Sequence, residues 1–211
     1  MQQFPSIRLA VPMRVAAPFD DPAWIFELKM DGFRALAYIG EDGSCSLVSR
    51  KNNVYKSFAN LCSALAELPV RNAVLDGEIA SLDGKGRSQF YELLHRRGQP
   101  AFYAFDLLYM NGRDFRDLPL LERKKRLLRL IEKSKSPSII YAQHVRGKGT
   151  ALYREICKRD LEGIVAKRKD GLYSSTAQWL KVMNPAYTQH DGRHEMFNAF
   201  HDKTSRGRAT R

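Results

Sequence analysis

Apolar and polar residues alternate between positions 24 and 31, which is typical of a strand with two chemically different faces. Gly32 ends this strand, and residues 33–39 are predicted to form the next one. One face of the first strand carries Trp24, Phe26, Leu28 and Met30. The other face carries Ile25, Glu27, Lys29 and Asp31. A lysine between two carboxylates is a candidate nucleophile, although a salt-bridged solvent face would give the same pattern.

The same two periodicities predict the remaining elements, and strands and helices follow one another without regular βαβ alternation. This order favours an α+β fold with largely antiparallel sheets. Ser57 is the expected N-cap of the first helix, and Pro119 is expected in the first turn of the third. Further strands are predicted at 46–50, 73–82, 101–109, 163–169 and 178–183. Helices are predicted at 57–68, 90–96, 119–133 and 150–160.

The helix predicted at 119–133 has the clearest amphipathic pattern, with an apolar stripe and a basic face. A solvated surface is the favoured interpretation of the basic face, ahead of a binding patch. The stripe consists of Leu120, Leu127, Leu128 and Ile131. The basic face consists of Arg123, Lys124, Lys125, Arg126 and Arg129.

Charge separates this chain from an average globular protein. Its 211 residues are 44% hydrophobic, and 35 Lys+Arg against 23 Asp+Glu give a formal net charge of +12. Such an excess favours a polyanionic partner, such as nucleic acid or nucleotide. Part of it lies in residues 198–211, which are expected to be a disordered basic tail. Residues 1–21 are predicted as an extended arm, and residues 22–197 as the folded domain.

Several classes of protein are disfavoured by what the sequence lacks. The three cysteines show no metal-binding or disulfide spacing, so they are expected to be free thiols in a reducing compartment. We find no signal peptide, no apolar run long enough to cross a bilayer, and no glycine-rich phosphate loop. A cytoplasmic monomer with no membrane association is therefore expected.

Carboxylates mark two further places where chemistry is expected. Asp76 and Glu78 fall on one face of a strand, where their repulsion would be relieved by a metal ion or by ribose hydroxyl groups. A turn at an exposed strand end is the alternative. Glu162 precedes a buried strand and is a candidate ligand for a hard cation such as Mg²⁺. The alternative there is a helix C-terminal turn ended by Gly163.

Two residues remain ambiguous when each is considered alone. Lys181 lies on the same face of its strand as Trp179 and Met183, where it would meet a phosphate or extend to solvent. Phe105 lies in the most apolar strand of the chain, where an aromatic side chain usually belongs to the core.

Together these segments resemble the covalent nucleotidyltransferases: ATP-dependent DNA ligases, RNA ligases and mRNA capping enzymes. Lys29-Met30-Asp31-Gly32-Phe33-Arg34 matches the KxDGxR motif, and five other motifs follow in the family's order. The resemblance spans residues 10–197 and is strongest to the ligase domain of bacterial ligase D. The five other motifs are Ser49 to Asn52, Asp76-Gly77-Glu78, Phe102 to Leu107, Glu162 to Lys167 and Trp179 to Met183.

The resemblance implies an ATP-grasp-like nucleotidyltransferase domain, with antiparallel sheets flanked by helices and no OB-fold, that acts on ATP. It implies that Lys29 attacks the ATP α-phosphate and carries AMP to a DNA break during repair. The other implied roles are Glu27 at the adenine edge, Arg34 and Glu78 on the ribose, Phe105 stacked on the base, Lys181 on the α-phosphate, and Arg50 on the nucleotide or the 5′-phosphate of a nick. Glu162, with Glu78, is expected to hold a divalent cation, Mg²⁺ or Mn²⁺.

The chain departs from the family pattern in two ways. Met183 stands where the family usually has a second lysine, so one phosphate-facing cation is missing. Only 28 residues follow Met183, too few for the OB-fold domain that usually completes such ligases. Either the chain is a truncated ligase, or it is a natural adenylation domain without the OB-fold. A separate OB-fold or end-joining protein is an expected partner.

Three functions therefore remain open at this point. The favoured one is a DNA ligase-type adenylation domain acting on nicked or broken duplex. An RNA ligase would use the same chemistry on a different acceptor. A nucleic-acid-binding protein with degraded ligase activity would fit Met183 and the missing OB-fold.

Overall fold

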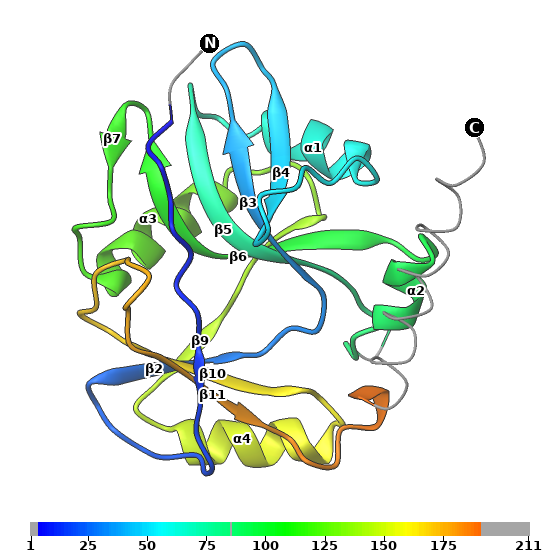
Figure 1. Ribbon diagram of the computed structural model, residues 1–211, viewed down its shortest axis with the longest axis vertical. Coiled ribbons are helices and arrows are strands. Elements are labelled where there is room, and N and C mark those ends of the chain that lie inside the picture. Colours follow the sequence, from blue (N-terminus) through cyan, green and yellow to red (C-terminus); the bar gives the residue numbers. More distant parts are fainter. Residues whose placement is uncertain (1–3, 85, 191–211) are drawn as a thin grey trace, which may run out of the picture.

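Two β-sheets, one above the other in Figure 1, make up the framework of the protein. The structure is a computed structural model, and it describes residues 4–84 and 86–190. The tail predicted at 198–211 lies outside the described residues, as does the end of the domain predicted at 22–197. Antiparallel pairings predominate in both sheets, and helices flank them, so the predicted α+β class is confirmed.

The five-stranded sheet contains the strand that leads to Lys29. Within this sheet, β1 and β11 pair in parallel, and all other pairings are antiparallel. The strand order is β1 (Met13–Arg14), β11 (Trp179–Met183), β10 (Gly163–Arg168), β2 (Trp24–Leu28) and β9 (His144–Arg146). Helix α4 (Gly149–Lys158) packs below it in Figure 1.

The six-stranded sheet begins where the chain leaves the first one, because β2 and β3 belong to different sheets. Asn111 and Gly112, both at positive φ, form the tight turn between β6 and β7. The main strand order is β4 (Cys45–Ser49), β3 (Phe33–Ile39), β5 (Ala73–Ser81), β6 (Pro100–Met110) and β7 (Arg113–Asp114), with β8 (Ile139–Tyr141) paired in parallel to β6.

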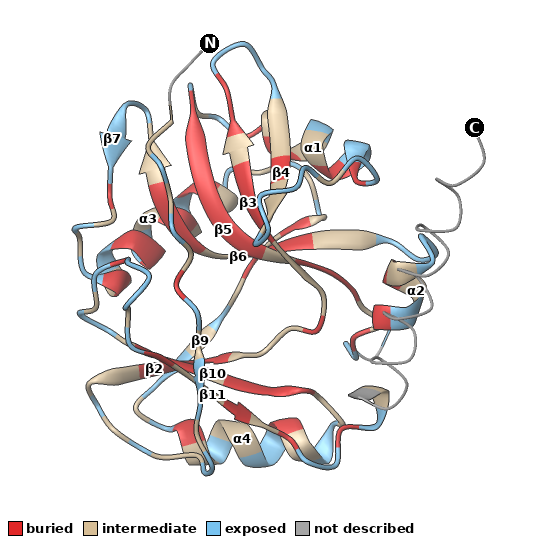
Figure 2. Ribbon diagram, in the orientation of Figure 1, coloured by how far each residue is buried: buried red, intermediate tan, exposed pale blue. Residues whose placement is uncertain are grey.

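Apolar side chains on the outer face of the six-stranded sheet form the main core. Ile39, Leu75 and Leu107 from the strands meet Leu65 and Leu127 from the helices, and all five are 0–1% exposed. Figure 2 shows the same burial as red segments in the central strands. The helices are α1 (Ala59–Ala66), α2 (Phe90–Leu94) and α3 (Leu120–Ile131), and a short 3₁₀ turn follows the last strand at Thr188–His190.

The N-terminal arm crosses both sheets. Figure 1 shows it in blue, running from the six-stranded sheet down to β1, which pairs with β11. Ala10 is fully buried, and its carbonyl oxygen accepts a hydrogen bond from Arg34 Nη1 at 2.6 Å. Val11 and Pro12, on this segment, line a cavity between the two sheets.

Two local predictions about helices are wrong. Helix α1 begins at Ala59, and its N-cap is Phe58, which makes no side-chain capping bond, so Ser57 does not cap it. The basic face of α3 is not uniformly solvated, because Arg123 and Lys124 are 0% and 1% exposed. Both lie within one helical turn of Leu120 and Leu127, which places them toward the core.

Arg123 is buried because it has a complete set of partners. Its Nε and Nη2 donate to Asp106 Oδ1 and Oδ2 at 2.7 and 2.9 Å, and its Nη1 donates to the Gly171 carbonyl at 3.0 Å. Asp106 is also fully buried. This ion pair fastens α3 to β6 and to the loop that precedes β11.

No helix within 4–84 and 86–190 is long and apolar enough to cross a membrane.

Arg123→Met should lower the free energy of unfolding by about 3–5 kcal/mol, because it leaves the Asp106 carboxylate buried without its cation. The double variant Arg123→Met/Asp106→Leu should recover much of this loss, since no unpaired charge remains. Urea unfolding followed by circular dichroism would measure both.

Arg126→Met is the matched control on the same helix. Arg126 pairs with Glu122 near the surface, where their side chains are 32% and 51% exposed, so the loss should stay below about 1 kcal/mol. Equal losses for Arg123→Met and Arg126→Met would contradict a special role for the buried pair.

Candidate active site

Lys29 lies where the chain crosses from β2 toward the six-stranded sheet. Its backbone N–H donates to the Gly163 carbonyl oxygen at 2.9 Å, which ties it to the start of β10. A side chain at Gly163 would place its Cβ 2.2 Å from the Val182 carbonyl oxygen, so this approach requires glycine. Lys29 Nζ lies 2.7 Å from Glu162 Oε2, and their side chains are 24% and 4% exposed. The lysine therefore reaches solvent while its partner stays buried.

A cavity of about 210 Å³ opens beside this pair, and we call it the Lys29 cavity. Seven residues singled out from the sequence line it, and Glu162 joins them through its ion pair with Lys29. The cavity has a mixed lining, with apolar walls and convergent polar groups, as small-molecule sites usually have. The seven residues are Glu27, Lys29, Arg34, Arg50, Glu78, Phe105 and Lys181.

Glu27 is held at the inner end of the cavity by two lysines. Lys124 Nζ lies 2.5 Å from Glu27 Oε1, and Lys167 Nζ lies 2.6 Å from Glu27 Oε2. Burial by itself would raise the pKa of Glu27, but the two ammonium groups lower it below its ordinary value. The carboxylate is therefore ionised, and both of its oxygens are already engaged.

Arg34 forms a second buried ion pair, with Asp76. Its Nε and Nη2 donate to the two carboxylate oxygens at 3.0 and 2.7 Å. Tyr173 donates its hydroxyl to the same carboxylate at 2.5 Å. The guanidinium carbon lies 5.2 Å from the ring centroids of both Phe105 and Trp179. Arg34 is thus fixed between aromatic rings at the wall of the cavity.

Glu78 differs from the other site carboxylates. It pairs in register with Arg34 across β3 and β5, yet none of the hydrogen bonds or ion pairs found in the described part of the chain involves its carboxylate. Burial raises its pKa to about 8, the cations Lys29 and Arg34 oppose this rise, and Glu162 and Asp76 add to it. The group is consequently a protonated carboxylic acid over much of the neutral range.

The remaining predicted residues, Arg50, Lys181 and Phe105, also line the cavity. Arg50 is exposed at the end of β4, while Lys181 on β11 and Phe105 on β6 are half-buried. Phe105 is thus more than a core aromatic, because its ring also faces the cavity. Met183, where the family pattern has a lysine, lies at the end of β11 opposite Gly163.

Sequence reasoning missed four residues that shape the site: Lys124, Lys167, Tyr173 and Trp179. Lys124 had a usable signal, since it occurs one helical turn from Leu120 and Leu127 on the apolar stripe. Lys167 and Trp179 lie within two of the six motifs, but the neighbouring sequence does not indicate which residues they contact. Tyr173 reaches Asp76 from 97 positions away, and no short-range pattern predicts such a contact.

Comparison with known proteins gives a consistent result. Residues 9–182 match the model of the ATP dependent DNA ligase domain. The multifunctional non-homologous end joining protein LigD of Pseudomonas aeruginosa is 35% identical over 167 residues, which is 75% of this chain and 20% of that protein. The SPbeta prophage-derived DNA ligase-like protein LigB of Bacillus subtilis is 31% identical, over 83% of this chain and 66% of that protein.

Solved structures show the same relationship. The ligase domain of LigD from M. tuberculosis superposes with a TM-score of 0.70 at 30% identity, covering 82% of this chain and 58% of that one. Mycobacterial DNA ligase D complexed with ATP and MES gives 0.69 at 28% identity, covering 83% and 60%. The chain thus spans a fifth of the LigD protein and just under three fifths of the solved ligase domain. The resemblance seen in the six motifs is confirmed, and the chain belongs to the family of ATP-dependent DNA ligase domains.

Proposed function

We propose that this domain adenylates itself at Lys29 and passes the AMP to the 5′-phosphate of a DNA break, as a step in DNA repair. The observation that carries the proposal is the pairing of Lys29 with Glu162 at a cavity lined by Glu27, Arg34 and Glu78. A nucleophilic amine, buried carboxylates and aromatic rings around one cavity suit a nucleotide substrate.

In the first step, the Lys29 nitrogen forms a bond to the ATP α-phosphorus, and the bond from that phosphorus to the pyrophosphate oxygen breaks. The amine must lose a proton to attack, and Glu162 Oε2, at 2.7 Å, is in position to accept it. Lys181 and Arg50 line the same cavity and would neutralise phosphate charge. Pyrophosphate leaves, and the phosphoramidate holds AMP for transfer.

The nucleoside would occupy the inner part of the cavity. Phe105 offers an aromatic face for the base, and Glu27 lies at the inner edge, where it would meet adenine. The Glu78 carboxyl makes no hydrogen bond or ion pair among the described residues, so ribose hydroxyl groups would supply the hydrogen bonds that it lacks. Arg34 pairs with Glu78 in register and would contact the ribose from the neighbouring strand.

A divalent cation, Mg²⁺ or Mn²⁺, fits the donors available beside Lys29. Glu162 and Glu78 are close enough to influence each other's charge, and both would supply the oxygen ligands that Mg²⁺ prefers, because a bound cation would favour the ionised form of Glu78. No group of three or more His, Cys, Asp or Glu side chains able to hold a metal occurs in the described ranges, so phosphate and water oxygens would complete the shell. When bound, the cation would offset the negative charge that develops on the phosphates.

DNA as the acceptor is supported by the net charge of +12 and by the exposed Arg50 at the cavity. A separate OB-fold or end-joining protein would supply further DNA contacts. Met183 stands where the family usually has a lysine, so one phosphate-facing cation is missing. We expect this loss to weaken nick sealing more than self-adenylation.

Lys29→Arg should abolish the covalent AMP adduct while leaving the protein folded. The guanidinium keeps a cation beside Glu162, but it cannot act as the nucleophile. Incubation with labelled ATP and Mg²⁺, followed by intact-mass measurement and then addition of nicked duplex, would separate adenylation from transfer.

Lys56→Arg, at an exposed position, is the matched control and should form the adduct normally. An adduct that persists in Lys29→Arg, or that never forms on the wild-type protein, would refute the proposal. A nicked RNA duplex in parallel tests the acceptor, because faster transfer to RNA would indicate an RNA ligase.

Glu78→Gln should remove a pH-dependent loss of stability. The unfolded carboxyl ionises near 4.5 and the folded one near 8, so the folded state binds the extra proton between these values. Stability from this group is therefore highest at low pH and declines as pH rises from about 4.5 to about 8. Urea titrations across this range should show that the free energy of unfolding of the variant rises relative to that of the wild type as the pH increases.

Glu67→Gln changes an exposed carboxyl at the C-terminal end of α1 and serves as the comparison. The difference in free energy of unfolding between Glu67→Gln and wild type should not change with pH. If Glu78→Gln gives a flat difference as well, the carboxyl of Glu78 is not held protonated in the folded protein.

A further inference from the structure

A second and larger cavity, of about 520 Å³, lies away from Lys29, between α1 and the loop that follows α2. We call it the Arg96 cavity. It is lined by the start of α1, by Leu93 and by the loop from Arg96 to Pro100, with Ser138 at one edge. Nothing in the proposed adenylation chemistry uses these residues, although the cavity is more than twice the volume of the Lys29 cavity.

The lining of the Arg96 cavity is positively charged. Arg96 and Arg97 are both exposed, and no carboxylate belongs to the lining. Neither guanidinium forms an ion pair within residues 4–84 and 86–190. Two arginines beside a concavity without a counter-charge favour an anionic ligand, because phosphate oxygens can accept paired hydrogen bonds from guanidinium groups.

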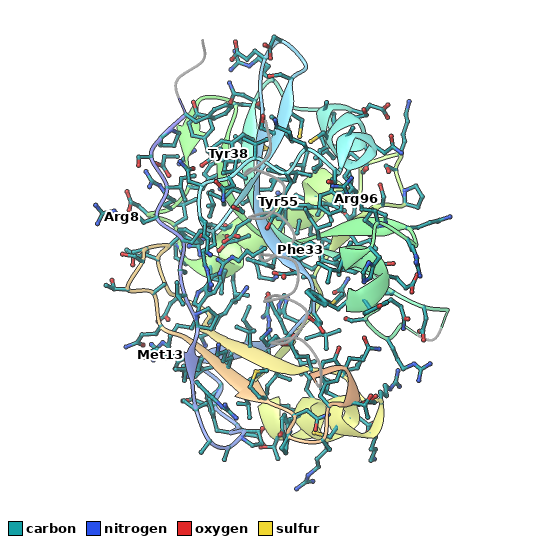
Figure 3. The ribbon with its side chains drawn as sticks, turned by 45° about the vertical axis from the view of Figure 1, so that its right-hand side comes forward. Arg8, Met13, Phe33, Tyr38, Tyr55 and Arg96 are labelled. Carbon is teal, nitrogen blue, oxygen red and sulfur yellow. The ribbon has the colours of Figure 1, made fainter. Side chains whose placement is uncertain are left out.

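An aromatic cluster joins this cavity to the active site. The ring of Phe33 lies 6.0 Å from that of Tyr55 and 6.3 Å from that of Phe58, between centroids, and Phe58 lines the Arg96 cavity. Tyr55 donates its hydroxyl to the Arg34 carbonyl oxygen at 3.3 Å. Figure 3 labels Phe33, Tyr55 and Arg96, and in that view Arg96 lies to the right of the two aromatic residues.

Arg50 extends the basic surface toward Lys29. Burial raises the pKa of Tyr55 to about 12, Glu78 adds to the rise, and Arg50 opposes it, so the phenol lies within electrostatic reach of both site residues. Arg50 itself lines the Lys29 cavity. Exposed arginines therefore occur at both cavities, Arg50 at one and Arg96 and Arg97 at the other, and the aromatic cluster of Phe33, Tyr55 and Phe58 connects the two.

We propose that the Arg96 cavity binds backbone phosphates of the DNA whose broken end is placed at Lys29. The inference rests on the proposed function for the identity of the polymer. Arg96 and Arg97 would contact phosphates without reading bases, and so would set the position of the strand relative to the nucleophile. The open, exposed setting of both arginines suits a continuous phosphodiester chain that passes over the surface.

The test uses the full chain with Arg96→Asn and Arg97→Gln combined. Arg96 has a φ of 59°, and asparagine tolerates this left-handed conformation better than most residues, so the loop should keep its shape. The control combines Lys125→Gln and Arg129→Gln. These two exposed residues lie on α3, on the other side of Figure 1 from α2, and their removal lowers the net charge equally.

Binding of a labelled nicked duplex should be measured as a function of salt concentration. Each lost phosphate contact makes the negative slope of log K against log salt less steep by about 0.9. The slope of the Arg96/Arg97 variant should therefore be less steep than that of the wild type by about 1.8, and the slope of the α3 control should change much less. Formation of the Lys29 adduct without DNA should be the same in both variants and in wild type.

Equal slopes for the two variants would overturn the inference, because net charge alone would then explain the binding. Unchanged duplex binding in the Arg96/Arg97 variant, with normal adduct formation, would overturn it while leaving the adenylation proposal intact. Absence of the adduct in wild type would instead refute the adenylation proposal, and the binding slopes would still report on the Arg96 cavity.

Discussion

The buried Glu27 carboxylate connects the two halves of the molecule, and the geometry of the site depends on it. Glu27 comes from β2 and Lys167 from β10, both in the five-stranded sheet, whereas Lys124 comes from α3, which packs on the six-stranded sheet. Lys124 Nζ also donates to the carbonyl oxygens of Phe105 and Ala142, at 3.3 and 3.1 Å. Removing any one of these charges would leave the others buried and uncompensated, which is far more costly than losing a surface pair. The relative placement of the sheets is therefore tied to the ionisation of a single side chain.

The Arg34–Asp76 pair performs a similar task nearer the cavity mouth. Arg34 belongs to β3 and Asp76 to β5, the Ala10 carbonyl belongs to the N-terminal arm, and Tyr173 belongs to the loop before β11. The pKa of the Tyr173 phenol is raised by burial and by Asp76, so the hydroxyl stays protonated and keeps donating to the carboxylate. One ion pair thereby positions the arm, two strands and a loop around the rings of Phe105 and Trp179.

The sequence predicts the strands and helices well where one periodicity continues for a whole element, as in residues 24–28, 101–109 and 120–131. It also predicts that Lys29, Glu78 and Glu162 are chemically unusual, because charged residues interrupt apolar strands there. It fails for side chains whose partners are distant. Arg123 and Lys124 look like solvent-facing residues by composition, yet their positions on the apolar stripe turn them inward, where Asp106 and Glu27 compensate them. Local patterns predict the direction in which a side chain points, but they do not identify the partner that compensates its buried charge.

The charges around the Lys29 cavity fall into two groups with different physical roles. Lys124 and Arg34 bind carboxylates and carbonyl groups, and Lys167 binds the Glu27 carboxylate, so these three cations hold the framework. Lys181 and Arg50 line the cavity without an ion pair to any carboxylate in the described residues, and Glu78 retains an unused carboxyl. A site with unused cations at its outer part and an unused carboxyl further in is complementary to a molecule with phosphates at one end and hydroxyl groups beyond them. The internal ion pairs fix where that molecule must lie, and the unpaired groups determine what it must be.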